Sequence, residues 1–328
     1  MSRFLAVEKK MQAAFKLTAP YFSQPARADG IYKKHAYPFC LPVECAHENL
    51  FPLIRQTAAD YFIRHKIQWH DGQNGKPSNH MCDSQVCCAN FLFPFANQPH
   101  ALAVLLRRVF PTLAEMLPVE DGQFVAFEWI GEQNYLGEKG SRHGVRTRGA
   151  NFTSADAAVK FRHQDGQVQF VLIEWKYTES YGSTWLRLSK SGTDRTEIYQ
   201  HLYDQAGCPL NKELLPAFDA LFYEPFYQFM RQQFLAQEME KAHEGGADIV
   251  SLLHIAPGHN SDFMRITSPD LRELGMSATG AWQKLVQTPG RFISIHTEDL
   301  FGPFLRDASF EMPDWKEYIS ARYEWVLG

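Results

Sequence analysis

Two carboxylates and a lysine stand in the middle of the chain, within segments that are otherwise apolar. Asp156 belongs to SADAAVKF, and both Glu174 and Lys176 belong to QVQFVLIEWKY. Side chains alternate between the two faces of a strand, so Glu174 and Lys176 share one face. Asp165-Gly166 predicts a tight turn between the two segments, and pairing across it can bring Asp156 within reach of Glu174.

These three charges predict a metal-dependent hydrolytic site. Charges on apolar strands cost desolvation free energy unless they are paired or bind a metal. Asp156 and Glu174 offer hard oxygen ligands that suit Mg²⁺, with Mn²⁺ as a substitute, and the Trp175 carbonyl could complete the set. Lys176 could orient or deprotonate a water, or stabilise negative charge on phosphorus. Spacing alone leaves open an ordinary solvated strand face.

The segments that position these residues alternate in character along the chain. Residues before 120 show mainly helical periodicity, including NLFPLIRQTAADYFIRH and HALAVLLRRVFPTLAEML. Three consecutive strands are then predicted, the last two forming a hairpin, at 123–130, 154–161 and 167–177. Helices are expected in TDRTEIYQHLYDQAG and between Glu213 and His243, before a buried strand in ADIVSLLHIAP.

The last part of the chain adds a strand or edge element at 291–301 and a Pro-initiated helix in PDWKEYISARYEWV. The sequence therefore predicts an α/β protein with three parts. These are a mainly helical N-terminal part (1–120), a catalytic core (121–260), and a C-terminal strand and helices packed on that core (261–328).

Motif and order together resemble the PD-(D/E)XK, or restriction-endonuclease-like, nuclease superfamily. Asp156 in TSADAAV stands at that family's metal-binding Asp, although Ala155 replaces the usual Pro, and IEWKYTES supplies Glu174 and Lys176 at the E-x-K position. Residues 45 to 300 are more specifically similar to a bacterial group described as restriction endonucleases. The resemblance implies a mixed central sheet flanked by helices and a nuclease that cuts DNA, as an endonuclease or exonuclease.

Many members of this superfamily add an acidic residue upstream of the metal-binding Asp. The resemblance favours Glu138, in NYLGE, and places Glu128, in FEWIGE, second. Structural roles stay open for both: a turn-stabilising carboxylate for Glu138 and a strand salt bridge for Glu128.

Several other polar residues have both functional and structural interpretations. A basic stretch could contact phosphate or be a solvated loop: Lys139, Arg142, His143, Arg146 and Arg148. Gln85 and Asn90 could contact a base or form structural hydrogen bonds near a helix capped by Asp83 or Ser84. Trp69 and His70 could stack on a base, although a buried Trp is more usual.

Bulk properties limit the alternatives. The net charge of −4 excludes a protein that coats DNA through overall positive charge. The 328 residues contain no apolar run of membrane-spanning length and no apolar signal segment, which predicts a cytoplasmic protein. Double-strand cutting would favour a homodimer. Two other hypotheses stay open: a catalytically silent member that binds nucleic acid or protein, and a structural zinc site built from Cys40, Cys45, His47, His80 and Cys82.

Overall fold

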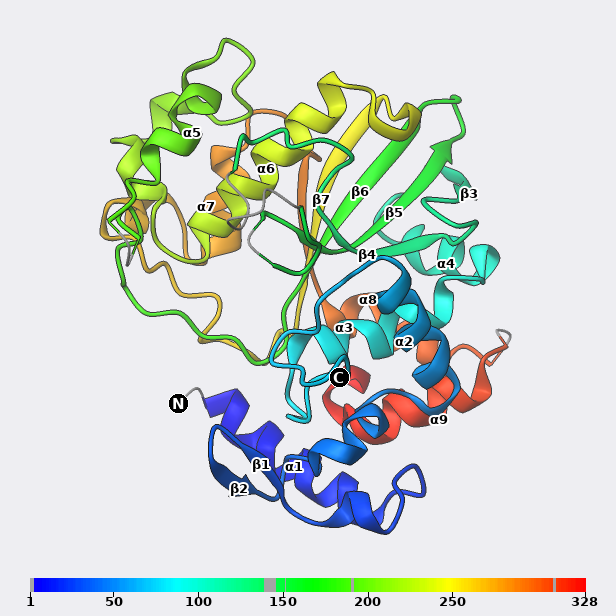
Figure 1. Ribbon diagram of the computed structural model, residues 1–328. Coiled ribbons are helices and arrows are strands. Elements are labelled where there is room, and N and C mark those ends of the chain that lie inside the picture. Colours follow the sequence, from blue (N-terminus) through cyan, green and yellow to red (C-terminus); the bar gives the residue numbers. More distant parts are fainter. Residues whose placement is uncertain (1–2, 139–145, 151, 190–191, 309–310) are drawn as a thin grey trace.

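A six-stranded mixed sheet lies at the centre of the computed structural model, with helices on both faces (Figure 1). The structure describes residues 3–138, 146–150, 152–189, 192–308 and 311–328. The sheet strands are β3 (Leu113–Leu117), β4 (Val125–Trp129), β5 (Ala155–His163), β6 (Val168–Trp175), β7 (Ile249–Ala256) and β8 (Phe292–His296). The predicted α/β class and restriction-endonuclease-like arrangement are confirmed.

The described helices and a small hairpin complete the chain. The helices are α1 (Arg3–Thr18), α2 (Arg55–Arg64), α3 (Ser84–Leu92), α4 (Pro99–Leu106), α5 (Thr196–Asp204), α6 (Phe226–Lys241), α7 (Ala278–Leu285), α8 (Thr297–Arg306) and α9 (Pro313–Arg322). The hairpin pairs β1 (Gly30–Tyr32) with β2 (His35–Tyr37). Among these helices, none has the length and apolar character that crossing a bilayer requires.

Strand order follows from one hairpin and two parallel crossovers. β5 and β6 pair antiparallel across the turn at Gly166, as predicted, and Gly166 adopts the positive φ of 93° that this turn needs. β3 and β4 both pair antiparallel with β5, whereas β7 and then β8 run parallel to β6. The predicted order of three strands, a helix and a strand is therefore confirmed.

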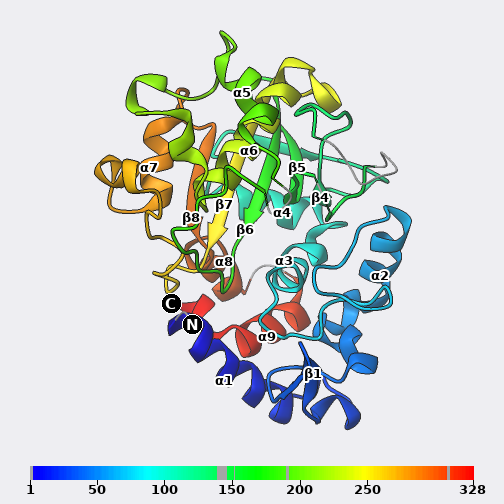
Figure 2. The same cartoon turned by 60° about the vertical axis from the view of Figure 1, so that its left-hand side comes forward.

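Both faces of the sheet are buried, which explains why its strands are apolar throughout. Val159 and Ile173 pack on one face in a core shared with α1, α3, α4, α8 and α9, and Ala158 and Leu172 pack on the other face against α5, α6 and α7. Figure 2 shows these two helical layers on opposite sides of the strands. Because the layers come from distant parts of the sequence, the sheet holds the whole chain together.

Three predicted elements differ from the structure. HALAVLLRRVFPTLAEML is not helical throughout: α4 ends at Leu106, because Pro111 cannot continue a helix, and the following residues form β3. The expected boundary at 120 therefore falls after a strand of the core sheet. The long helix expected from Glu213 begins only after Pro225, as α6, and the segment 291–301 changes from β8 to α8 at Thr297.

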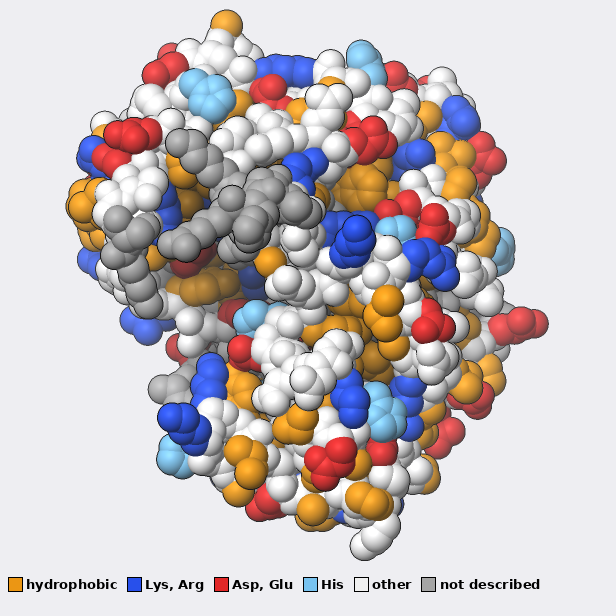
Figure 3. Space-filling model, viewed as in Figure 1, with side chains coloured by type: hydrophobic (Ala, Val, Ile, Leu, Met, Phe, Trp, Pro, Cys, Tyr) orange, Lys and Arg blue, Asp and Glu red, His pale blue; other side chains and the backbone are white. Residues whose placement is uncertain are grey.

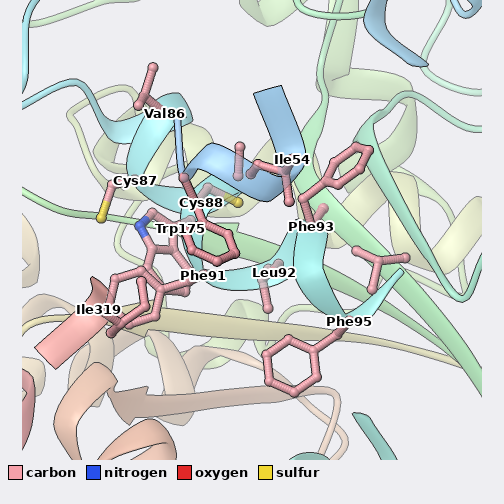
Figure 4. Close-up of a cluster of buried hydrophobic side chains, with 14 of the residues drawn as sticks. Ile54, Val86, Cys87, Cys88, Phe91, Leu92, Phe93, Phe95, Trp175 and Ile319 are labelled. Carbon is pink, nitrogen blue, oxygen red and sulfur yellow. The ribbon is translucent and has the colours of Figure 1, made fainter. Parts of the chain in front are cut away.

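Helix α3 anchors the end of β6. Every residue of α3 after Ser84 is buried, and the helix lies between the sheet and α9 (Figure 4). The fully buried Trp175 points into this cluster, where its ring centroid lies 5.0 Å from that of Phe91 and 5.9 Å from that of Phe301. Since Trp175 stands between Glu174 and Lys176, its packing directs those two side chains to the opposite face.

Candidate active site

Three acidic residues are aligned across three neighbouring strands. The register of β4 with β5 places Glu128 opposite Asp156, and the register of β5 with β6 places Asp156 opposite Glu174. Lys176 follows directly after β6 on the same face as Glu174. The structure therefore brings together Asp156, Glu174 and Lys176, as the hairpin predicted, and adds Glu128.

Glu174 and Lys176 form a buried ion pair that α6 holds in place. Their side chains are 2% and 6% exposed, and Lys176 Nζ contacts Glu174 Oε1. Lys176 Nζ also donates a hydrogen bond to Gln228 Oε1 at 2.8 Å. Gln232 donates to Glu174 Oε2 and, at 2.9 Å, to the Ser154 carbonyl. Gln228 and Gln232 are four residues apart on α6 and therefore face the sheet together.

Asp156 lies in an environment that disfavours its charged form. Its Oδ2 accepts a hydrogen bond from the Trp175 N–H at 2.7 Å. Burial, and then the negative charge of Glu174, nevertheless raise the pKa of Asp156 well above its usual value. A group of buried carboxylates with this property favours either a bound proton or a cation.

Glu128 is positioned by its own hydrogen bonds and by an unusual backbone. Gln85 Nε2 donates to its Oε1 at 2.6 Å, and Ser154 Oγ donates to its Oε2 at 2.9 Å. Burial raises the pKa of Glu128, and the charge of Glu174 adds to the increase. Its φ of 50° lies in the left-handed region, which is strained for a non-glycine residue and occurs most often at functional sites.

The pKa of Lys176 is raised well above its usual value. Burial alone would lower this pKa, but the negative charge of Glu174 and neighbouring Tyr181, Glu179 and Asp156 outweigh it. Lys176 is therefore positively charged at neutral pH. This state fits a group that orients water or stabilises negative charge, and it opposes the role of a base.

A cavity of about 520 Å³ opens beside these residues. Glu128, Asp156 and Lys176 line its inner wall, and His70 and Asp83 from the N-terminal part line the facing wall. In Figure 3, acidic, histidine and apolar side chains lie together in a hollow between the N-terminal part at the bottom and the sheet region above it. The proposed reacting groups are thus accessible to a ligand.

Glu138, the favoured upstream carboxylate, lies elsewhere. It accepts hydrogen bonds from Thr153 N at 2.7 Å, Thr153 Oγ1 at 2.5 Å and Tyr199 OH at 2.7 Å. It lines a different cavity, together with Arg231 of α6. The structure therefore does not bring Glu138 to Asp156, because the chain turns away from the sheet after β4. Glu128, the second choice, occupies that place.

Two arginines of the basic stretch support the loop that follows β4. Arg146 donates to the carbonyl groups of residues 130–132 at 2.5 to 3.1 Å. Arg148 donates to the Glu128 carbonyl at 3.1 Å and forms a bidentate ion pair with Glu120 at 2.9 Å. Both guanidinium groups thus have structural partners. The remaining members lie outside the described residues: Lys139, Arg142 and His143.

The polar residues with open roles divide between the site and the core. Gln85 and His70 line the cavity, and Asp83 is the residue that caps α3, accepting from Val86 N at 2.9 Å. Asn90 is fully buried and bonds to Phe51 N and Tyr323 OH, so its role is structural. Trp69 stacks on the ring of Phe62 at 3.7 Å and is buried.

The zinc hypothesis finds no support in the part of the chain that the structure describes. There, no group of three or more His, Cys, Asp and Glu side chains is placed to hold a metal ion. Cys40, Cys45 and Cys82 are buried free thiols, and burial raises the pKa of each. Protonated thiols of this kind are typical of core residues.

Sequence analysis gave no signal for Gln228 and Gln232, which hold the ion pair. Their four-residue spacing within the apolar helix α6 is the pattern that could have identified them. No curated protein and no solved structure matched the chain. One family model, described as "Restriction Endonuclease associating with ARP", matches residues 11–324. The chain therefore belongs to the family of restriction endonucleases associating with ARP.

Proposed function

We propose that this protein is a nuclease that hydrolyses phosphodiester bonds, with DNA as the expected substrate. The observation that carries the proposal is the alignment of Glu128, Asp156 and Glu174 on three neighbouring strands, with Lys176 beside them at an open cavity. The family description, which names a restriction endonuclease, supports the same activity.

Mg²⁺, or Mn²⁺ in its place, is the cofactor that we propose for Asp156 and Glu174. Carboxylate oxygens suit these hard ions, and the raised pKa of Asp156 reflects a repulsion that a bound cation would relieve. Two carboxylates and the Trp175 carbonyl would leave other positions for water and phosphate oxygens, as Mg²⁺ prefers. When bound, the ion would polarise the scissile phosphate and neutralise charge on the leaving oxygen.

The chain's own residues would supply positioning and charge. Lys176 would orient the attacking water and stabilise the negative charge that develops on the phosphate, since its raised pKa keeps it protonated. Gln228 and Gln232 would hold Lys176 and Glu174 in register with each other. Gln85 would hold Glu128 from the side of the N-terminal part.

Cleavage of supercoiled plasmid, linear duplex, single-stranded DNA and RNA in Mg²⁺, Mn²⁺ or EDTA tests this proposal. We expect metal-dependent cutting that Lys176→Ala abolishes. The control is Lys160→Ala, which removes a β5 lysine whose Nζ donates to the Gly245 carbonyl instead. No cutting by folded wild-type protein, or cutting unchanged by Lys176→Ala, would favour a catalytically silent binding protein. Sedimentation of the active species would test for the homodimer that double-strand cutting favours.

A further inference from the structure

The N-terminal part contributes a charged pair to the cavity that the proposed chemistry does not use. His70 Nδ1 lies 3.3 Å from Asp83 Oδ2, and the His70 main-chain N–H donates to Gln85 Oε1 at 2.7 Å. The other oxygen of Asp83 caps α3 by accepting from Val86 N. Because α3 is packed on both sides, this arrangement fixes His70 relative to the sheet.

The two members of the pair differ in accessibility. The Asp83 side chain is 5% exposed, whereas that of His70 is 72% exposed at the cavity wall. Asp83 occupies Nδ1, so Nε2 is the nitrogen that a ligand in the cavity can reach. The buried acid thus holds an accessible imidazole in a fixed orientation.

The cavity needs positive charge if it is to receive a nucleic acid. Asp71, Glu128, Asp156 and Glu179 line it along with Asp83, and these carboxylates would repel a phosphate. The charge of Lys176 is largely matched by its partner Glu174. A further cation on the facing wall would therefore contribute strongly to substrate binding.

His70 can supply this charge at neutral pH. The hydrogen bond to Asp83 raises the pKa of His70 to about 8, with additional contributions from the charges of Asp83, Asp71 and Glu128. His80, which also lines the cavity, cannot serve in the same way, since burial lowers its pKa to about 4.

We propose that His70, oriented by Asp83, is a phosphate-binding residue of the cavity, and that its ligand is the phosphodiester backbone of the substrate strand. This inference rests on the proposed function, because a nucleic acid must occupy the cavity. The imidazolium would donate a charge-assisted hydrogen bond from Nε2 to a phosphate oxygen.

The sign of the pH dependence follows from the groups that face His70, which are Asp71, Asp83 and Glu128. All three favour its protonated form. The affinity that His70 provides is therefore fully present below pH 7 and is lost as the pH rises through about 8. Substitution of His70 should remove this pH dependence.

Fluorescence anisotropy of labelled oligonucleotides in EDTA measures binding without cutting. We expect His70→Gln to weaken binding by roughly ten-fold or more, the effect of one charge-assisted hydrogen bond, and to lower the salt slope by about 0.7 to 0.9. His70→Lys should retain most of the affinity. His296→Gln is the matched control, because His296 Nδ1 also lies 3.3 Å from an aspartate, Asp299, but outside this cavity.

Binding by His70→Gln with wild-type affinity and salt slope would overturn the inference. A loss of cutting rate with unchanged affinity would also overturn it, because His70 would then act in the chemical step. These results differ from failure of the proposed function, in which wild-type protein itself would neither bind nor cut any substrate.

Discussion

Replacement of Asp156 by Asn should stabilise the protein in the absence of metal. The folded-state pKa of Asp156 is raised well above its usual value because of burial and the charge of Glu174. A carboxyl with a raised folded pKa has its full stability below the unfolded pKa and loses it as the pH rises through the folded pKa. At pH 8 the wild-type protein therefore bears the whole cost of a charged Asp156, and Asp156→Asn removes it.

The size of the effect follows from two opposing contributions. Each pH unit between the folded and unfolded pKa values costs about 1.4 kcal/mol of stability above both. Against this, Asn is a neutral acceptor for the Trp175 N–H, and the weaker hydrogen bond costs about 1 kcal/mol. We expect a net gain of more than about 1 kcal/mol at pH 8, or about 2 °C in Tm. The gain should shrink as the pH falls.

Thermal unfolding in EDTA and in Mg²⁺ tests this reasoning. Asp156→Asn should have the higher Tm in EDTA, whereas Mg²⁺ should raise the Tm of the wild-type protein more than that of the variant. Asp270→Asn, at an exposed aspartate, is the charge-matched control and should change neither value. A lower Tm for Asp156→Asn in EDTA, or an equal response of both proteins to Mg²⁺, would refute the account.

The remaining predictions concern the ion pair, the upstream carboxylate and the β6 anchor. Lys176→Met should lower the free energy of unfolding by about 3–5 kcal/mol in urea titrations, because its partner carboxylate stays buried without a counter-charge. Glu128→Gln should slow cutting by about 10- to 100-fold, whereas Glu138→Gln should leave the cutting rate unchanged; equal rates for the two would exclude Glu128 from the site. Trp175→Ala should cost about 3–5 kcal/mol, against within about 0.5 kcal/mol for Trp185→Ala at a 46%-exposed position.

The hairpin that carries the site could be predicted because its signals are local. Alternation of side chains along β6 placed Glu174 and Lys176 on one face, and Asp165-Gly166 marked the turn that brings β5 back alongside. The helix α5 and the buried strand β7 likewise follow from periodicity within short segments.

The parts that sequence analysis missed depend on contacts between distant segments. The choice between Glu128 and Glu138 is decided by the register of β4 against β5, which are separated by a long connection that no local pattern constrains. The contribution of His70 depends on Asp83 and on the packing of α3 beneath the sheet. Such tertiary contacts have no signature in a single sequence.

The measurement that tests the central claim most directly is plasmid cleavage in Mg²⁺ by wild-type protein and by Asp156→Asn, with Asp270→Asn as control. The variant is predicted to be the more stable protein in EDTA, so its loss of activity could not be attributed to unfolding. The account predicts cutting by the wild-type and control proteins and none by Asp156→Asn. Cutting at the wild-type rate by Asp156→Asn, or none by the wild-type protein, would contradict it.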